Sequence, residues 1–255
     1  MGLVRDVVMQ VLPHIHPIAK PILRRYWASR HPSSRRVYDL GDRHAEIFTS
    51  IYRQNFWGSG ESRSGYGSTM SSTRSIRRRL PKLLRELEAK TFLDAPCGDF
   101  NWMRTVDLKD VFYTGADIVP DLIFGLHARH SDLTHRFQVL DIINEQVPAV
   151  DLWMCREVMM HLPTKDVFSI LRNFHRSESR YLLATSFDMT SVNDDLPSPG
   201  FRPLNLQILP IGLPHPILHF DDFVVPAQPR IMGLWSREQV GVALQSALWF
   251  EAVTA

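Results

Sequence analysis

The sequence predicts an α/β fold with a largely parallel central sheet and helices on both of its faces. From residue 91 onward, short apolar segments of strand length recur, and segments with helical spacing of apolar residues lie between the later ones. Short apolar strands that alternate with helices are typical of βαβ units, whose strands run parallel. The 255 residues and 44% hydrophobic content suit one globular domain with additions.

Each element follows from its own pattern. Strands are expected at 91–95, 111–118, 136–142, 150–157 and 180–187. A helix is expected over 163–177, because four apolar residues recur at helical spacing behind Thr164, a suitable N-cap. An amphipathic helix over 76–90, with Pro81 in its first turns, leads into the first strand.

The flanking regions predict additions to this core. We expect a helical extension or partly mobile arm over 1–45, so that residues 1–90 form an extension with a lid loop and 91–255 form the main domain. The proline-rich residues 189–235 form a late insertion, and such long insertions are more often functional than idle. Ser236 would cap a helix over 236–249, residues 250–255 would form a last strand, and any antiparallel edge strand must come from 215–235.

Composition narrows the classes of protein. Two cysteines cannot form a disulfide framework, so a reducing, cytoplasmic setting is expected. No apolar run reaches the ~20 residues of a membrane span, and residues 1–20 lack the continuous apolar run of a signal peptide. Residues 1–90 carry 17 Lys+Arg against 7 Asp+Glu, whereas the remainder carries 12 against 20. The basic part either faces an anionic partner such as RNA or is a solvated surface that neutralises the acidic remainder.

Polar residues follow four successive predicted strands. Asp94 and Gly98 follow the first, Asp117 closes the second, Asp141 closes the third, and the run 155–157 closes the fourth. In a parallel sheet, ligands bind outside the carboxyl ends of the strands. Asp117 lies 23 residues after Asp94, the spacing of an acid that binds ribose hydroxyls.

The segments "DAPCG", "GAD", "LDI" and "DLWMCREVMMHLP" resemble class I S-adenosylmethionine-dependent methyltransferases over residues 91–187. The resemblance implies a Rossmann-like fold and S-adenosylmethionine as cofactor. It places Asp94 and Gly98 at the methionine end of the cofactor and Asp117, with Ile118 beside it, at the ribose. It places Asp141 and Ile142 at the adenine, and Cys155 and Arg156 near the methyl group.

A narrower resemblance covers residues 51–235. The segments "WGSGESRSGYGS", "DAPCGDFNWM", "REVMMHLP" and "FRPLNL" resemble a bacterial methyltransferase subfamily associated with glycan and polysaccharide biosynthesis, including sugar O-methyltransferases. It implies a hydroxyl of a small carbohydrate or polysaccharide precursor as the acceptor. The chain departs from commoner members at Arg156-Glu157, where they have Arg-Asp, and at Phe201-Arg202, where they have Trp-Arg.

A hydroxyl is a poor nucleophile unless its proton leaves as the new bond forms, and histidine is the usual acceptor of that proton. His161 lies six residues after Cys155 and is the expected general base, with Glu157 as the alternative base or as the group that orients it. The simpler interpretation of His161 is a structural residue in the "LPTKD" turn.

The glycine-rich loop, residues 55–68, is expected to close over the cofactor rather than to form an exposed linker. Trp57 in this loop and Arg74, at the start of the next helix, complete the expected cofactor site, Arg74 as a partner for the methionine carboxylate. The expected acceptor-binding residues are polar forks and aromatic faces that suit sugars: Tyr66, Arg202, Asn205 and Trp235.

Other chemistries fit less well. The cluster of His215, His219, Asp221 and Asp222 has no standard zinc spacing, so no metal is expected, and any magnesium would be held by carboxylates. An RNA methyltransferase is the alternative that the basic first third favours, but the Asn/Asp-Pro-Pro-Tyr signature of amino methylation is missing after the fourth strand. A non-catalytic, cofactor-binding scaffold is the third alternative. The sequence does not indicate an oligomeric state.

Overall fold

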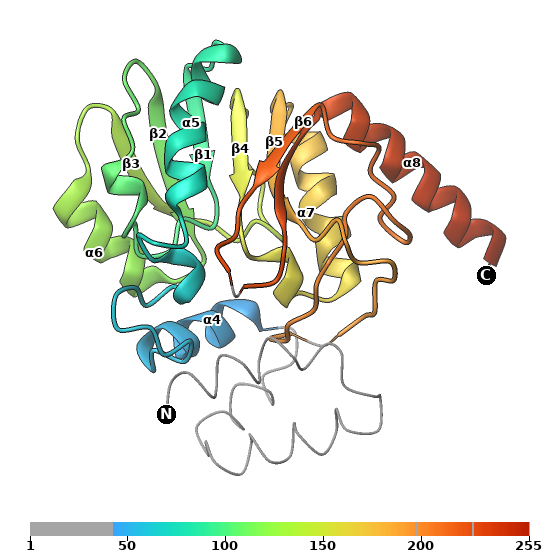
Figure 1. The fold of residues 1–255 in the computed structure, drawn as a ribbon, viewed down its shortest axis with the longest axis horizontal. Coiled ribbons are helices and arrows are strands. Elements are labelled where there is room, and N and C mark those ends of the chain that lie inside the picture. Colours follow the sequence, from blue (N-terminus) through green and yellow to red (C-terminus); the bar gives the residue numbers. More distant parts are fainter. Residues whose placement is uncertain (1–42, 197, 226, 255) are drawn as a thin grey trace.

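The computed structural model describes residues 43–254 apart from 197 and 226, so the predicted extension over 1–45 lies almost wholly outside the described residues. Seven strands form one sheet in the order β3-β2-β1-β4-β5-β7-β6 (Figure 1). Their bounds are Thr91–Asp94 (β1), Phe112–Asp117 (β2), His135–Val139 (β3), Leu152–Cys155 (β4), Tyr181–Ser186 (β5), Leu218–Asp221 (β6) and Ile231–Ser236 (β7). The first five strands are parallel, and β7 is antiparallel to both of its neighbours. The predicted fold class is confirmed.

Helices cover both faces of this sheet. Their bounds are His44–Arg53 (α4), Arg74–Glu86 (α5), Pro120–His130 (α6), Thr164–Arg176 (α7) and Arg237–Thr254 (α8). Apolar residues of α5 and α6 pack with Phe92 and Met154 on one face, whereas α7 and α8 pack with Leu93 and Trp153 on the other. Neighbouring strand residues therefore enter opposite layers, as the pleat of a doubly covered sheet requires.

Strand β6 confirms that an antiparallel edge strand comes from 215–235, and β7, which lies between β5 and β6, ends one residue after that range. The prediction of a last strand at 250–255 is wrong, because residues 250–254 continue α8. No glycine or proline follows Gly241, so nothing in the sequence ends the helix before the C-terminus. Ser236 caps α8 as expected: its hydroxyl accepts the Gln239 N–H, and the Gln239 side chain accepts the Ser236 N–H, a capping box.

Two predicted helix details are wrong. Thr164 is the first residue of α7 and not its cap, which is Pro163. The Thr164 N–H and hydroxyl both donate to Oδ1 of Asp195, at 2.8 and 2.9 Å, so a residue of the late insertion caps the helix. Pro81 lies in the middle of α5, not in its first turns, because that helix begins at Arg74.

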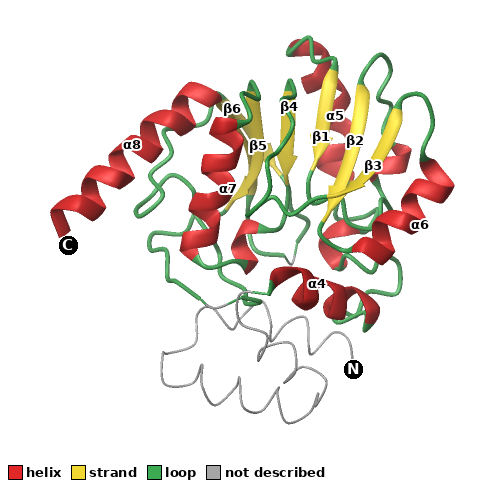
Figure 2. Ribbon diagram, turned by 180° about the vertical axis from the view of Figure 1, so that it is seen from behind, coloured by secondary structure: helices red, strands yellow, loops and turns green. Residues whose placement is uncertain are grey.

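Helix α4 lies across the carboxyl edge of the sheet, the edge at which the parallel strands end (Figure 1 and Figure 2). At one end, Arg53 pairs with Asp121 in the first turn of α6. At the other end, His44 Nε2 lies 3.0 Å from Asp166 Oδ2 in the first turn of α7, and both side chains are buried. The helix therefore connects the two layers of helices at the edge where ligands bind in such sheets.

Candidate active site

Two buried carboxyl groups stand at the carboxyl ends of β1 and β2. Asp94 accepts a hydrogen bond from the Tyr113 hydroxyl at 2.9 Å, and burial raises its pKa to about 8. Asp117 accepts the N–H groups of Gly98 and Val119, both at 3.1 Å, and burial raises its pKa to about 6. The structure thus brings Asp94, Gly98 and Asp117 together, as expected from their order in the sequence.

The glycine-rich loop rests on the turn that follows β1. Gly98 has φ of 56°, and a Cβ there would collide with the Ser64 hydroxyl. The Asp99 carboxylate accepts the Ser62 hydroxyl at 2.9 Å and the Arg63 N–H at 2.8 Å, while the Asp99 N–H donates to Ser64. These contacts are incompatible with an exposed linker and place the loop beside the predicted cofactor residues.

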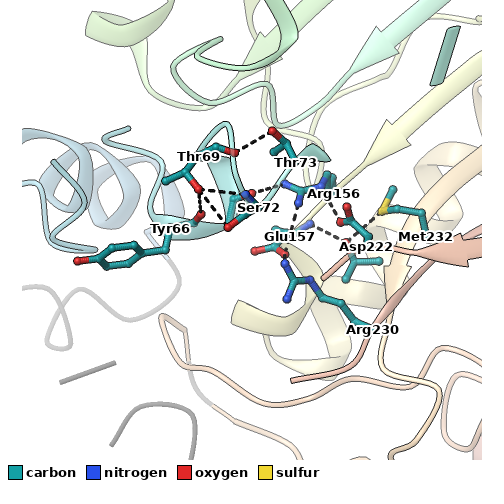
Figure 3. A network of polar contacts seen from close by, with 11 residues as sticks. Tyr66, Thr69, Ser72, Thr73, Arg156, Glu157, Asp222, Arg230 and Met232 are labelled. Carbon is teal, nitrogen blue, oxygen red and sulfur yellow. Dashed lines mark hydrogen bonds and ion pairs between the residues drawn. The ribbon is translucent and has the colours of Figure 1, made fainter. Parts of the chain in front are cut away.

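A cluster of four charged side chains joins the end of β4 to the segment between β6 and β7 (Figure 3). Arg156 Nε donates to Asp222 Oδ2 at 2.8 Å, and Nη1 donates to the Gly67 carbonyl at 3.0 Å. Arg230 pairs with Glu157. Burial would raise the pKa of Glu157, but Arg230 and Arg156 outweigh it and the net shift is downward.

Sequence reasoning did not identify Arg230, and it considered Asp222 only as a metal ligand. Nothing in the spacing of residues 222 and 230 indicates a pairing with residues 156 and 157, which lie more than sixty positions earlier. The one signal in the sequence is charge: the insertion contains an acid and a base, Asp222 and Arg230, that are complementary to Arg156 and Glu157. Burial raises the pKa of the fully buried Asp222, and Arg156 opposes this shift.

His161 ends a 3₁₀ turn, Met159–His161, directly after this cluster. Its Nδ1 lies 2.6 Å from the Gly200 carbonyl oxygen. A carbonyl can only accept, so Nδ1 carries the proton and Nε2 is left as an acceptor. The ring also lies 4.9 Å from that of Trp57 and 5.9 Å from that of Phe201. Burial lowers the pKa of His161, which favours the neutral ring near neutral pH.

The remaining predicted cofactor residues have mixed surroundings. Cys155 is buried and its pKa is raised by burial, so it is a packed thiol. The Asp141 carboxylate accepts the N–H groups of residues 143 and 144 and so stabilises a turn, with Ile142 buried beside it. Ile118 is half-buried next to Asp117, and Arg74 is exposed at the start of α5.

Three of the predicted acceptor residues differ in their exposure and contacts. Tyr66 is 46% exposed, and Figure 3 shows its ring pointing away from the charged cluster. The Arg202 side chain is buried, and the Arg202 backbone N–H donates to the carbonyl of Met160, the residue before His161. The Asn205 side chain donates to the carbonyls of 188 and 190 and orders the insertion.

Trp235 does not lie at the carboxyl edge. It pairs with Leu182 near the start of β5, is fully buried, and donates from Nε1 to the Pro214 carbonyl. The antiparallel direction of β7 brings its last residues to the opposite edge of the sheet. The expectation that Trp235 contacts the acceptor is therefore corrected to a core role.

Within residues 43–254, no group of three or more His, Cys, Asp or Glu side chains is arranged to hold a metal ion. Of the four residues considered for a metal, His215 packs against His219, and Asp222 pairs with Arg156. No described helix has the length and apolar character needed to cross a membrane.

The sequence matches no protein-family model and no curated protein. The structure is similar to 1,6-didemethyltoxoflavin-N1-methyltransferase from Burkholderia thailandensis, with TM-score 0.56 and 14% identity over 75% of this chain and 89% of that one. It is also similar to the N-methyltransferase NodS from Bradyrhizobium japonicum WM9, with TM-score 0.54 and 11% identity over 73% and 97%. Human N-acetylserotonin methyltransferase aligns less well, with TM-score 0.42 and 16% identity, and the chain spans 41% of its length. The chain therefore has the Rossmann-like fold of class I methyltransferases.

Proposed function

We propose that the protein is an S-adenosylmethionine-dependent O-methyltransferase whose acceptor is a hydroxyl of a sugar or polysaccharide precursor. The observation that carries the proposal is His161, a partly enclosed histidine at the carboxyl edge whose tautomer is fixed by the Gly200 carbonyl 2.6 Å away. The neutral Nε2 is the group that a hydroxyl acceptor requires. Glu157 supports this role by its negative charge, which favours the protonated ring.

The carboxyl edge fits the cofactor in its donor set and its charge. Asp117 holds the turn at Gly98 through one carboxylate oxygen, and each oxygen keeps a lone pair for a ribose hydroxyl. Three carboxyl groups, Asp94, Asp99 and Asp117, surround Cys97 and raise its pKa further than burial alone. Asp94 stays largely protonated near neutral pH, so the negative potential comes from Asp99 and Asp117, and it suits a cofactor that carries an ammonium and a sulfonium group.

S-adenosylmethionine supplies a methyl group on a positively charged sulfur. The residues of this chain do the rest: Asp117 holds the ribose, Asp94 and Gly98 line the methionine end, and the glycine-rich loop excludes water. His161 Nε2 would accept the hydroxyl proton while the methyl group passes from the sulfur, which keeps the electron pair of the broken carbon–sulfur bond, to the acceptor oxygen. Neutral His161 thus becomes an imidazolium beside Glu157, and the proton then leaves to solvent.

The carbohydrate acceptor is supported by the narrower sequence resemblance and by Trp57, whose ring next to His161 offers an aromatic face. Two of the similar structures are of N-methyltransferases, so transfer to nitrogen is the rival acceptor chemistry. The rival is disfavoured by the lack of an Asn/Asp-Pro-Pro-Tyr signature at 155–158.

Two linked measurements test the proposal. Calorimetry should show that S-adenosylhomocysteine binds the wild type and that Asp117→Ala weakens binding at least tenfold, since each charged hydrogen bond contributes about 1.5–3 kcal/mol. Equal binding by both proteins, or none by either, removes the cofactor assignment.

The second measurement follows methyl transfer from labelled cofactor to a panel of oligosaccharides. His161→Ala should lower the transfer rate about 100-fold or more, while its affinity for S-adenosylhomocysteine stays unchanged. If His161→Ala is as active as the wild type, His161 is not the general base. Transfer to an amine and not to hydroxyls would replace the acceptor.

A further inference from the structure

Arg202 is an arginine whose charge is only partly compensated by the described residues. Its side chain is 5% exposed, and Nη1 lies 3.0 Å from Asp195 Oδ1. The other two nitrogen positions, Nε and Nη2, are buried and have no hydrogen-bond partner among residues 43–254. A buried guanidinium normally uses most of its donors, so these two N–H positions require an explanation.

Asp195 contacts Arg202 only through Nη1 and makes no hydrogen bond to Nε or Nη2. The same oxygen that faces Arg202 also accepts the N–H and the hydroxyl of Thr164 and the N–H of Leu196. Four donors therefore converge on one carboxylate oxygen. Consistent with this sharing, burial lowers the pKa of Arg202 more than its acidic neighbours raise it.

The two unused positions have a specific geometry. Nε and Nη2 lie on one edge of the planar guanidinium and present two parallel N–H groups. That edge is the one that binds a carboxylate or a phosphate through two parallel hydrogen bonds. Arg156 contrasts with this arrangement, because its Nε already donates to the carboxylate of Asp222.

Backbone hydrogen bonds place Arg202 beside the proposed base. The Arg202 N–H donates to the Met160 carbonyl at 3.1 Å, and the Gly200 N–H donates to the His161 carbonyl at 3.3 Å. The Gly200 carbonyl in turn accepts from the His161 ring. Residues 200–202 and 160–161 are therefore held together by backbone hydrogen bonds, which join the segment that carries Arg202 to the turn that carries His161.

We propose that the acceptor carries an anionic group, a carboxylate or a phosphate, which binds the Nε/Nη2 edge of Arg202 while the hydroxyl to be methylated faces His161. This inference rests on the proposed function and narrows its substrate class from carbohydrates in general to acidic or phosphorylated ones. The late insertion then supplies both the contact that positions the base and the contact that selects the acceptor.

The test measures binding of three sugars to the protein saturated with S-adenosylhomocysteine: glucose, glucuronate and glucose 6-phosphate. At least one anionic sugar should bind about tenfold or more tightly than glucose, as expected for two charge-assisted hydrogen bonds. Preference for glucuronate identifies a carboxylate, and preference for the phosphate ester identifies a phosphate. Arg202→Gln should abolish the preference, and Arg202→Lys should retain part of it, because lysine keeps the charge but not the fork.

The matched control is Arg180→Gln, which removes an exposed arginine that pairs with Asp151 at the opposite edge of the sheet. It should leave the preference unchanged. Equal binding of all three sugars, failure of all three to bind, or an unchanged preference in Arg202→Gln would overturn the inference. Failure of S-adenosylhomocysteine to bind would instead overturn the proposed function, so the two failures are distinguishable. Arg202→Lys decides the question if Arg202→Gln does not fold.

Discussion

At the scale of single residues, the carboxyl edge contains two aspartates whose charged forms are disfavoured by burial. Asp94 is 2% exposed and Asp117 is 8% exposed, and both have raised pKa values. A carboxyl group whose pKa is higher in the folded than in the unfolded chain makes folding less favourable as it ionises. The protein therefore keeps, at its proposed cofactor site, groups that lower its stability near neutral pH, as functional sites often do.

Asp94 gives a testable pH dependence. Its folded pKa of about 8 lies above the ~3.9 of an unfolded aspartate, so the folded state holds the proton more tightly. The contribution of Asp94 to the free energy of unfolding is therefore largest below pH ~4. It decreases by about 1.4 kcal/mol per pH unit until the pH passes the folded pKa. Asp94→Asn keeps an acceptor for the Tyr113 hydroxyl and should flatten this decrease, measured by urea unfolding between pH 5 and pH 8.

The control for this series is Asp188→Asn, because Asp188 is exposed. It should follow the wild-type pH profile. A decrease in Asp94→Asn as steep as that of the wild type would show that Asp94 is ionised in the folded protein across this range.

At the scale of elements, α7 shows how a helix start can depend on a distant segment. Thr164 has the residue type of a cap, yet the structure uses it as the first helical residue and supplies the capping oxygen from Asp195. Local sequence could not reveal this, because the two residues are 31 positions apart. Ser236 of α8 was predictable because its partner, Gln239, lies three residues away in the same sequence motif.

Asp195→Ala should destabilise the protein by about 1–2 kcal/mol through loss of the helix cap, and by more because the buried Arg202 also loses its carboxylate partner. Thermal or urea unfolding measures this change. Asp188→Ala, at an exposed position directly before the insertion, should change stability by less than about 0.5 kcal/mol, as surface substitutions do. Equal effects of the two substitutions would show that the contact with Thr164 does not stabilise α7.

At the scale of the whole molecule, the carboxyl edge is closed by contacts between segments that are far apart in the sequence. Arg156, directly after β4, contacts both Gly67 of the glycine-rich loop and Asp222 after β6. Glu157 pairs with Arg230, just before β7. These pairs are buried, so removing one partner leaves a charge without compensation in a region of low dielectric.

Asp222→Asn should therefore lower the free energy of unfolding by about 3 kcal/mol or more, because the Arg156 guanidinium stays buried without its carboxylate. The matched control is Asp121→Asn, which breaks the exposed pair with Arg53 and should cost less than about 1 kcal/mol. Both values come from urea denaturation at one pH. Similar losses for the two variants would contradict a special role for the buried pair.

The sequence was sufficient for the five parallel strands of the sheet and for the residues that lie at the ends of β1 and β2. Asp94, Gly98 and Asp117 meet at one edge because parallel strands bring their carboxyl ends together, a consequence of chain direction alone. The partners Asp222 and Arg230 were beyond such reasoning, since they arrive from a segment without periodicity. Trp235 was misplaced for a related reason: the direction of β7 decides which edge it reaches, and the sequence does not state that direction.

The contact of Asp195 with α7 has a consequence for protein engineering. Exchanging the late insertion for that of a relative is an obvious way to change the acceptor, on the view that the insertion is a separable cassette. Here one of its side chains completes the start of a helix, and its residues 200–202 hold the 3₁₀ turn at His161. A graft must therefore carry these contacts with it, or the exchange will alter the scaffold together with the specificity.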